Sequence, residues 1–171
     1  PQPADIGGRA ASLGLRSLAY WTDGKDKRVF HNSGDGRLIA VDGVTGKAIA
    51  GFGKNGSINL RECIIEGTDA TDVSSVSPAL VVGDIIVVQV IPGGSRNKEG
   101  APGKIRGFDV RTGKMVWSFN PIAQPGDPNV KTWEAGSNLY TGQAGAWSMA
   151  TSQAARCGSV TTSAPFRSLS R

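Results

Sequence analysis

Apolar and polar residues alternate over short segments through much of this chain, which is the pattern of half-buried β-strands. The pattern occurs in two matching copies, GRLIAVDGVTGKAIAGF at residues 36–52 and GKIRGFDVRTGKMVWSF at residues 103–119. Asp42 matches Asp109 and Thr45 matches Thr112 at one constant offset, with no gap inside the copy. The sequence therefore predicts a repeated β structure.

Each copy contains the string Asp-x-x-Thr-Gly-Lys between two apolar segments. The Asp and Thr side chains can accept hydrogen bonds from the amides of such a turn, and glycine supplies a positive φ without steric cost. We therefore expect each copy to form a β-hairpin, with its second strand at residues 47–52 or 114–119.

Two further strand-like segments precede each hairpin, and no stretch shows sustained helical periodicity. These segments are residues 17–21 and 28–32 before the first hairpin, and 78–82 and 84–91 before the second. The chain is therefore predicted to be all-β, built from four-stranded antiparallel units. Repeated units of this kind are typical of propeller blades. The predicted blades span roughly residues 15–53 and 74–120, with the start of a third at residues 138–149.

Propeller blades bury their faces on one another, so two blades cannot close a ring. We therefore expect residues 1–149 to form an incomplete propeller, part of a longer protein. Residues 150–171 are rich in Ser, Thr, Ala and Arg and lack strand alternation. We expect this segment to be a disordered or aberrant tail.

The net charge of +5 invites a nucleic-acid function, but the distribution of charge argues against it. Residues 148–171 contain three arginines and no acidic residue. No strand carries a basic stripe interleaved with aromatic residues, so nucleic-acid binding is not predicted.

The sequence also lacks the apolar run of roughly 20 residues that a membrane helix needs. Attachment to a membrane would require segments outside this chain.

Catalytic and metal-binding sets cannot be assembled from the residue types alone. Cys63 and Cys157 are far apart and indicate neither a disulfide framework nor a metal site. Cys63 is expected to be a small buried or half-buried residue. His31 is the single histidine and is expected to be an ordinary strand residue, so no Ser/His/Asp set is proposed.

Several segments resemble the dehydrogenases that depend on pyrroloquinoline quinone (PQQ), of the quinoprotein glucose and alcohol dehydrogenase type. Residues 109–119 match the family's blade motif Asp-x-x-Thr-Gly-Lys-x-x-Trp-x-Phe, although Ala50 stands at the Trp position in the first copy. Residues 15–21 (LRSLAYW) look like the family's Arg-Gly-Leu-Ala-Tyr-Trp segment, with Ser17 replacing Gly. Residues 140–147 (YTGQAGAW) resemble the stretch leading to the tryptophan beneath the cofactor. The resemblance covers roughly residues 15–149.

This resemblance implies an eight-bladed propeller that oxidises a sugar or alcohol hydroxyl by hydride transfer to PQQ, with Ca²⁺ as a second cofactor. Arg16 matches the arginine beside the quinone oxygens, and Trp147 matches the indole on which the quinone stacks. Ser75 and Ser77 flank Val76, which stands where the family has a cofactor-contacting threonine. The alternatives are a surface arginine at position 16 and a buried tryptophan between blades at position 147.

The chain also departs from the family pattern. The metal-binding glutamate of alcohol-type members has no counterpart after residues 89–92, and Glu99 in the following loop is expected to be a solvated charge. No metal ligand is therefore assigned. The family's catalytic aspartate lies beyond this chain, so no catalytic residue is assigned and the isolated chain is expected to be inactive.

The family resemblance further implies a periplasmic location, at or near the inner membrane, and ubiquinone or cytochrome c as the electron acceptor. Two alternatives stay open. One is a non-catalytic scaffold of the same repeats that binds partner proteins, as in outer-membrane assembly. The other is a structural propeller segment. Arg16 and Trp147 favour the enzyme, because neither has a role in a scaffold.

Overall fold

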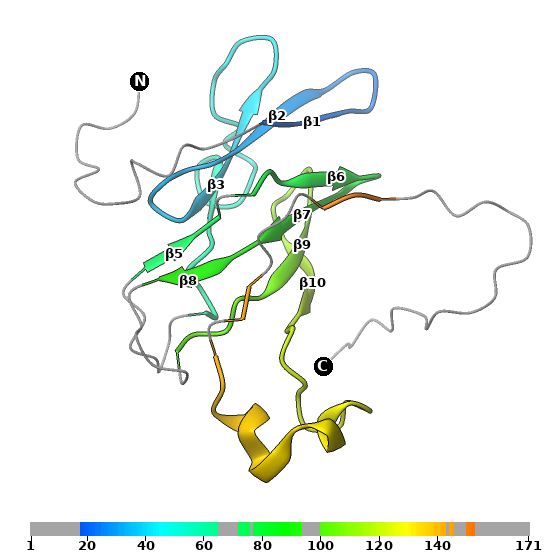
Figure 1. Ribbon diagram of the computed structural model, residues 1–171. Coiled ribbons are helices and arrows are strands. Elements are labelled where there is room, and N and C mark those ends of the chain that lie inside the picture. The colour runs from blue at the N-terminus through cyan, green and yellow to red at the C-terminus, as the bar shows by residue number, and fades with distance from the viewer. Residues whose placement is uncertain are drawn as a thin grey trace, which may run out of the picture.

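Two four-stranded antiparallel sheets, one around each copy of the repeat, dominate the computed structural model (Figure 1). The structure describes residues 18–64, 72–75, 77–93, 100–142, 144–145 and 150–152. Their regular structure is almost wholly β, and the two sheets pack together without closing into a ring. The predicted all-β, incomplete propeller architecture is therefore confirmed.

The first sheet has the strand order β1-β2-β3-β4. Its strands are β1 (Ala19–Thr22), β2 (Lys27–Asn32), β3 (Arg37–Asp42) and β4 (Ser57–Asn59). The register places Ala19 opposite Phe30, and Phe30 opposite Ala40. These three side chains are buried, while Tyr20 on the other face is exposed. The strands predicted before the first hairpin are confirmed to within a few residues.

The outer strand of the first sheet is not the predicted segment 47–52. Only Ala48 forms a bridge to β3, and the chain then leaves the sheet until the Gly56 carbonyl accepts from the Ala40 N–H (2.9 Å). Positive φ at Asn55 (53°) and Gly56 (88°) turns the chain back into β4. The small Ala50 offers no bulky side chain to hold the segment on the sheet, whereas Phe52 is fully buried in the core.

The second sheet has the order β10-β9-β7-β6. Its strands are β6 (Leu80–Val82), β7 (Ile85–Gln89), β9 (Ile105–Asp109) and β10 (Met115–Phe119). The pairing of β9 with β10 is irregular between Met115 and Trp117. The four predicted strands are confirmed, except that the strand predicted over residues 84–91 ends at Gln89.

Outside the two four-stranded sheets, the described residues form a small two-stranded sheet and two short helices. The chain continues from β7 into β8 (Ile91–Gly93), which pairs with β5 (Asp72–Ser74) in a separate two-stranded sheet. After β10 come two short 3-10 helices, η2 (Val130–Thr132) and η3 (Glu134–Leu139). The described residues contain no helix with the length and apolarity that a membrane crossing requires.

The two repeated turns are stabilised by their own side chains, as predicted. Asp42 Oδ1 accepts from the backbone N–H (2.6 Å) and the hydroxyl (2.9 Å) of Thr45. Asp109 Oδ1 accepts in the same way from Thr112, at 2.7 Å for both bonds. The glycine after each threonine has a positive φ, 68° in the first turn and 74° in the second. The motif therefore fixes both turns by the same local chemistry.

One core lies between the two sheets. Phe30, Leu38 and Ala40 enter it from the first sheet, and Ile86 and Phe108 enter it from the second. Each of these side chains is almost wholly buried. The face of the first sheet that carries Phe30 therefore packs against the face of the second sheet that carries Ile86.

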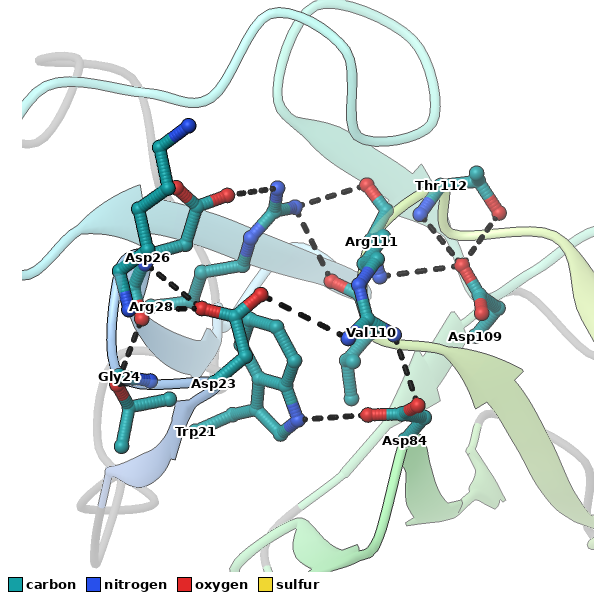
Figure 2. A network of polar contacts seen from close by, with 12 residues as sticks. Trp21, Asp23, Gly24, Asp26, Arg28, Asp84, Asp109, Val110, Arg111 and Thr112 are labelled. Carbon is teal, nitrogen blue, oxygen red and sulfur yellow. Dashed lines mark hydrogen bonds and ion pairs between the residues drawn. The ribbon is translucent and has the colours of Figure 1, made fainter.

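A polar network links the sheets at one end of this core (Figure 2). Trp21 Nε1 donates to Asp84 Oδ1 (3.1 Å), and the Arg111 guanidinium lies 4.6 Å from the centre of the Trp21 ring. Arg111 also pairs with Asp84 (2.8 Å). From the first sheet, Arg28 Nη1 donates to the carbonyls of Val110 (3.2 Å) and Arg111 (2.8 Å). Cation–π and charge-assisted contacts thus join the sheets where the apolar core ends.

The carboxylates at this end of the core are held in their charged form. The hydrogen bond from Arg111 is the main cause that lowers the pKa of Asp84 below the ordinary 3.8. Burial raises the pKa of Asp109, but the hydrogen bonds from Thr112 outweigh it, and the net shift is downward. A lowered pKa in the folded state contributes stability that is present above the unfolded value and lost as the pH falls through the folded value.

We therefore expect the free energy of unfolding to be flat near neutral pH and to fall once the pH drops below about 4, the ordinary carboxylate range. Asp84→Asn should lower stability at pH 7 and reduce the further loss in acid, because one titrating group is removed. Urea unfolding at a series of pH values measures both effects. Glu134→Gln, at an exposed carboxylate in η3, should leave the profile unchanged. An unchanged profile in Asp84→Asn would contradict the expectation.

A second prediction concerns the glycine beneath Trp117. A Cβ at Gly107 would overlap the Trp117 indole, which lies directly across the strand pair. We expect Gly107→Ala to destabilise the fold by about 1–3 kcal/mol, because the indole must move. Gly51→Ala is the matched control, because a Cβ there meets open space, and it should change stability by less than about 0.5 kcal/mol. Equal denaturation midpoints for the two variants would contradict the prediction.

Candidate functional site

A buried polar cluster lies where the two sheets meet, at the ends of β2 and β7. Its members are Asn32, Ser75, Ser77 and Gln89, each no more than 7% exposed. Asn32 ends β2, Gln89 ends β7, and the two serines belong to the segment between β5 and β6. Burying a polar group costs free energy unless the group is hydrogen-bonded. The hydrogen-bond partners of these four residues therefore show which of their polar atoms are satisfied and which could bind a ligand.

The cluster is joined by short hydrogen bonds across the two sheets. Asn32 Nδ2 donates to Ser75 Oγ (3.0 Å) and to the Ser77 carbonyl (3.1 Å). Ser75 Oγ donates its one proton to the Gln89 carbonyl (2.7 Å). Asn32 of the first sheet therefore holds both Ser75 and Ser77, and β7 of the second sheet holds Ser75.

One atom of the cluster is left unsatisfied. Asn32 Oδ1 is buried and has no hydrogen-bond partner among the described residues. An unfilled buried acceptor costs roughly 1–3 kcal/mol, and such groups in folded proteins are usually satisfied by water or a ligand. Asn32 Oδ1 therefore marks a place where an N–H or O–H donor fits.

The segment that leads to Trp147 runs close to this cluster. A Cβ at Gly103 would overlap the Ala144 carbonyl, and a Cβ at Gly142 would overlap the Gly100 carbonyl. Only glycine allows the two backbones to lie this close. A Cβ at Gly145 would lie 3.3 Å from Cγ1 of Ile91, the first residue of β8, and 3.5 Å from the carbonyl of Val90, the residue after β7. The glycines therefore place residues 144–145 against the strand end that carries Gln89.

The structure places two of the four predicted cofactor-binding residues. Ser75 and Ser77 are brought together and buried in the cluster. Arg16 and Trp147 lie outside the described residues, and so does Val76 between the serines. The assignment of all four to cofactor binding stays a prediction.

Sequence reasoning missed Asn32 and Gln89. The repeat holds a signal for them, because each is a polar residue that ends the second strand of its sheet. Asn32 pairs with Leu38 in the first sheet, and Gln89 pairs with Ile105 in the second. Leu38 and Ile105 match at the constant offset of the repeat, so the two polar residues occupy equivalent positions.

Other candidate residues are placed by the structure as follows. Trp21, the last residue of the predicted LRSLAYW segment, is buried in the core. Cys63 is exposed, so the expectation of a buried or half-buried thiol was wrong. Cys63 lies in the turn that follows the last strand of the first sheet and has a left-handed backbone conformation (φ 59°). Glu99 lies outside the described residues. In the described part of the chain, no three His, Cys, Asp or Glu side chains gather where they could hold a metal ion.

Comparison with known proteins shows which family this chain belongs to. The family model described as "PQQ: Glucose/ethanol/alcohol dehydrogenase, beta-propeller domain" matches residues 3–158. The chain is 38% identical over 122 residues to "Quinoprotein glucose dehydrogenase A" of Acinetobacter calcoaceticus, covering 71% of this chain and 15% of that protein. It is 41% identical over 108 residues to "Quinate/shikimate dehydrogenase (quinone)" of Acinetobacter baylyi, covering 60% and 12%.

A third relative is "Glycerol dehydrogenase large subunit" of Gluconobacter oxydans, 36% identical over 128 residues, with 72% of this chain and 16% of that protein covered. The chain thus spans between 12% and 16% of the length of these three relatives. The family model, in contrast, covers most of the chain and includes both repeated hairpins and the polar cluster. The chain therefore belongs to the family of PQQ-dependent glucose, ethanol and alcohol dehydrogenases and folds as part of its β-propeller domain.

Proposed function

We propose that this chain is part of a dehydrogenase that oxidises a sugar or alcohol hydroxyl by hydride transfer to PQQ. The observation that carries the proposal is the buried cluster around Asn32, with one unfilled acceptor, beside the segment that leads to Trp147. The printed names of the relatives support the substrate class, since they refer to glucose, quinate or shikimate, and glycerol.

The residues present fit the edge of such a cofactor. PQQ is a flat quinone that carries carbonyl and carboxylate oxygens and one ring N–H. Ser75 and Ser77 bring hydroxyl and peptide groups to one buried place, and Asn32 Oδ1 is an acceptor suited to an N–H donor. The Ser75 hydroxyl donates its hydrogen bond to the Gln89 carbonyl. Part of the role of Ser75 is therefore to fix its own position beside β7.

The proposal gives each residue a separate task. Arg16 would bind the quinone oxygens, because its guanidinium offers several donors in a fixed plane and stays charged. Trp147 would stack on the flat ring and orient it. Asn32 would act as a positioning residue that holds Ser75 and Ser77. When bound, the quinone supplies a hydride acceptor that no side chain can provide.

The remaining parts of the reaction are proposed for the whole protein. Ca²⁺ would polarise a reacting carbonyl as a Lewis acid, but this chain offers no assigned ligand for it. No catalytic base is assigned either, so we propose that the isolated chain is inactive. Ubiquinone or cytochrome c would accept the electrons, and the protein would work in the periplasm.

Titration of the purified chain with PQQ, with and without Ca²⁺, tests this proposal. We expect saturable quenching of tryptophan fluorescence, because Trp147 stacks on the quinone, and no dye reduction with glucose or ethanol. Trp147→Leu should remove most of the quenching, whereas Trp133→Leu, at a half-buried indole near η3, should retain it. Absence of saturable quenching by a folded chain would overturn the proposal in favour of the non-catalytic scaffold. Measured dye reduction would overturn the proposed inactivity.

A second test addresses the role of Ser75. We expect Ser75→Ala to lower the free energy of unfolding by about 1–3 kcal/mol, because a buried hydrogen bond to each sheet is lost. Ser57→Ala is the matched control, since its hydroxyl makes a longer bond (3.2 Å) at an exposed site and should matter little. Chemical denaturation measures both, and a Ser75→Ala variant as stable as the control would contradict the positioning role.

A further inference from the structure

A pocket lies between the end of β10 and the helices η2 and η3, apart from the buried cluster around Asn32. It has a volume of about 420 Å³, which is within the roughly 300–1,000 Å³ of small-molecule sites, and it is partly open to solvent. One stretch of the chain, residues 119–133, supplies the whole lining. The aromatic and polar lining residues are Phe119, Asn120, Asp127, Asn129, Thr132 and Trp133.

The lobe that surrounds the pocket, residues 119–140, has a small core of its own and extends away from the sheets beyond β10 (Figure 1). Ile122 (2% exposed) and Ala123 (9% exposed) are buried, yet neither belongs to the core between the two sheets. Asn138 of η3 is also buried, and its Nδ2 donates to the Ala123 carbonyl (3.0 Å). The structure describes every residue of this lobe. Contacts within the lobe therefore set the shape of the pocket.

Local hydrogen bonds orient the polar side chains of the pocket. Asp127 Oδ2 accepts from the Gln124 N–H (2.7 Å), and Asn120 Oδ1 accepts from the Ile122 N–H (3.1 Å). Asp127 Oδ1, Asn120 Nδ2 and the side-chain amide of Asn129 make no hydrogen bond to another described residue. The pocket thus offers a charged acceptor and amide donors whose positions are fixed before a ligand arrives.

Aromatic rings line the pocket from both ends of the stretch. Phe119 ends β10, and Trp133 lies between η2 and η3. Phe119 is 47% exposed and Trp133 is half-buried, so both rings present surface to solvent. An aromatic ring has partial negative charge on its face, so it attracts the weakly positive C–H groups of a saturated ring and also shields them from water.

This combination of groups favours one class of ligand. Among the described lining residues there is no lysine or arginine, and Asp127 is the single acid, so the pocket suits neither an anion nor a metal ion. An organic cation would pair with Asp127 and the rings but would leave the amide donors of Asn120 without a partner. A sugar ring has apolar C–H faces and hydroxyls at its rim, and each hydroxyl both donates and accepts hydrogen bonds.

We propose that this pocket binds a neutral sugar or cyclic polyol at a place separate from the quinone. The C–H face of the ring packs on Trp133, while Asp127 accepts from one hydroxyl and Asn120 donates to another. The pocket shares no residue with the cluster around Asn32, so it is a second binding place and not the site of hydride transfer. This inference goes beyond the proposed function and depends on the lining residues alone.

An NMR titration of the ¹⁵N-labelled chain with D-glucose, in the absence of PQQ, tests the proposal. We expect saturable shifts of the backbone amide signals of residues 120–133, with a Kd on the order of millimolar, because a hexose has few atoms. Cyclohexanol has a six-membered ring with a single hydroxyl, and choline is an organic cation. Each should bind at least about tenfold more weakly than glucose, because each leaves polar groups of the pocket unpaired.

Every result of this titration decides the proposal. Absence of saturable shifts with glucose would overturn it. Cyclohexanol that binds as tightly as glucose would show that the polar groups play no part, and choline that binds more tightly would assign the pocket to cations; both results would also overturn it. Since no quinone is present, failure here is distinct from failure of the PQQ titration.

Two variants test the assigned residues. Asp127→Asn keeps an oxygen for the Gln124 N–H and replaces the free acceptor with a donor, so it should weaken glucose binding at least about tenfold while preserving the turn. Trp133→Leu should weaken binding by a similar factor, because the flat ring face is lost. Glu134→Gln is the control: it alters an exposed carboxylate beside Trp133 but outside the lining, and glucose should bind to it as to the unaltered chain. Unchanged binding by Asp127→Asn, whose fold the same spectra establish, would contradict the proposal.

Discussion

Neither sheet can cover its own apolar faces, and this constraint shapes the rest of the molecule. A four-stranded sheet with side chains on both sides is stable only when something packs against it. Here the first sheet buries Phe30 and Leu38 against Ile86 and Phe108 of the second. The polar network around Arg111 closes the end of that contact, where apolar packing stops (Figure 2).

The candidate site depends on the same contact. Asn32 comes from the first sheet, while Gln89 comes from the second, and Ser75 receives a hydrogen bond from one and gives a hydrogen bond to the other. The positions of Ser75 and Ser77 are thus fixed by how the two sheets pack. A change in the core between the sheets would move the cluster, even if no residue of the cluster were altered.

The sequence alone was sufficient where local chemistry decides the outcome. Asp42 and Thr45 specify their turn by hydrogen bonds within a few residues, so the repeated turns and the strands that lead into them could be predicted. The outer strand of the first sheet could not, because the burial of Phe52 in the shared core competes with strand pairing. The hydrogen-bond partners of Asn32 could not be predicted either, since they lie more than 40 residues away and are found only by tertiary packing.

The outer strands of both sheets have a consequence for how this molecule meets its neighbours. β4 and β6 have three residues each, and β10 is paired irregularly near Met115. Short or distorted edges expose few aligned amide and carbonyl groups, so they are poor templates for an incoming strand. These strands therefore discourage the edge-on strand addition that leads to fibrils.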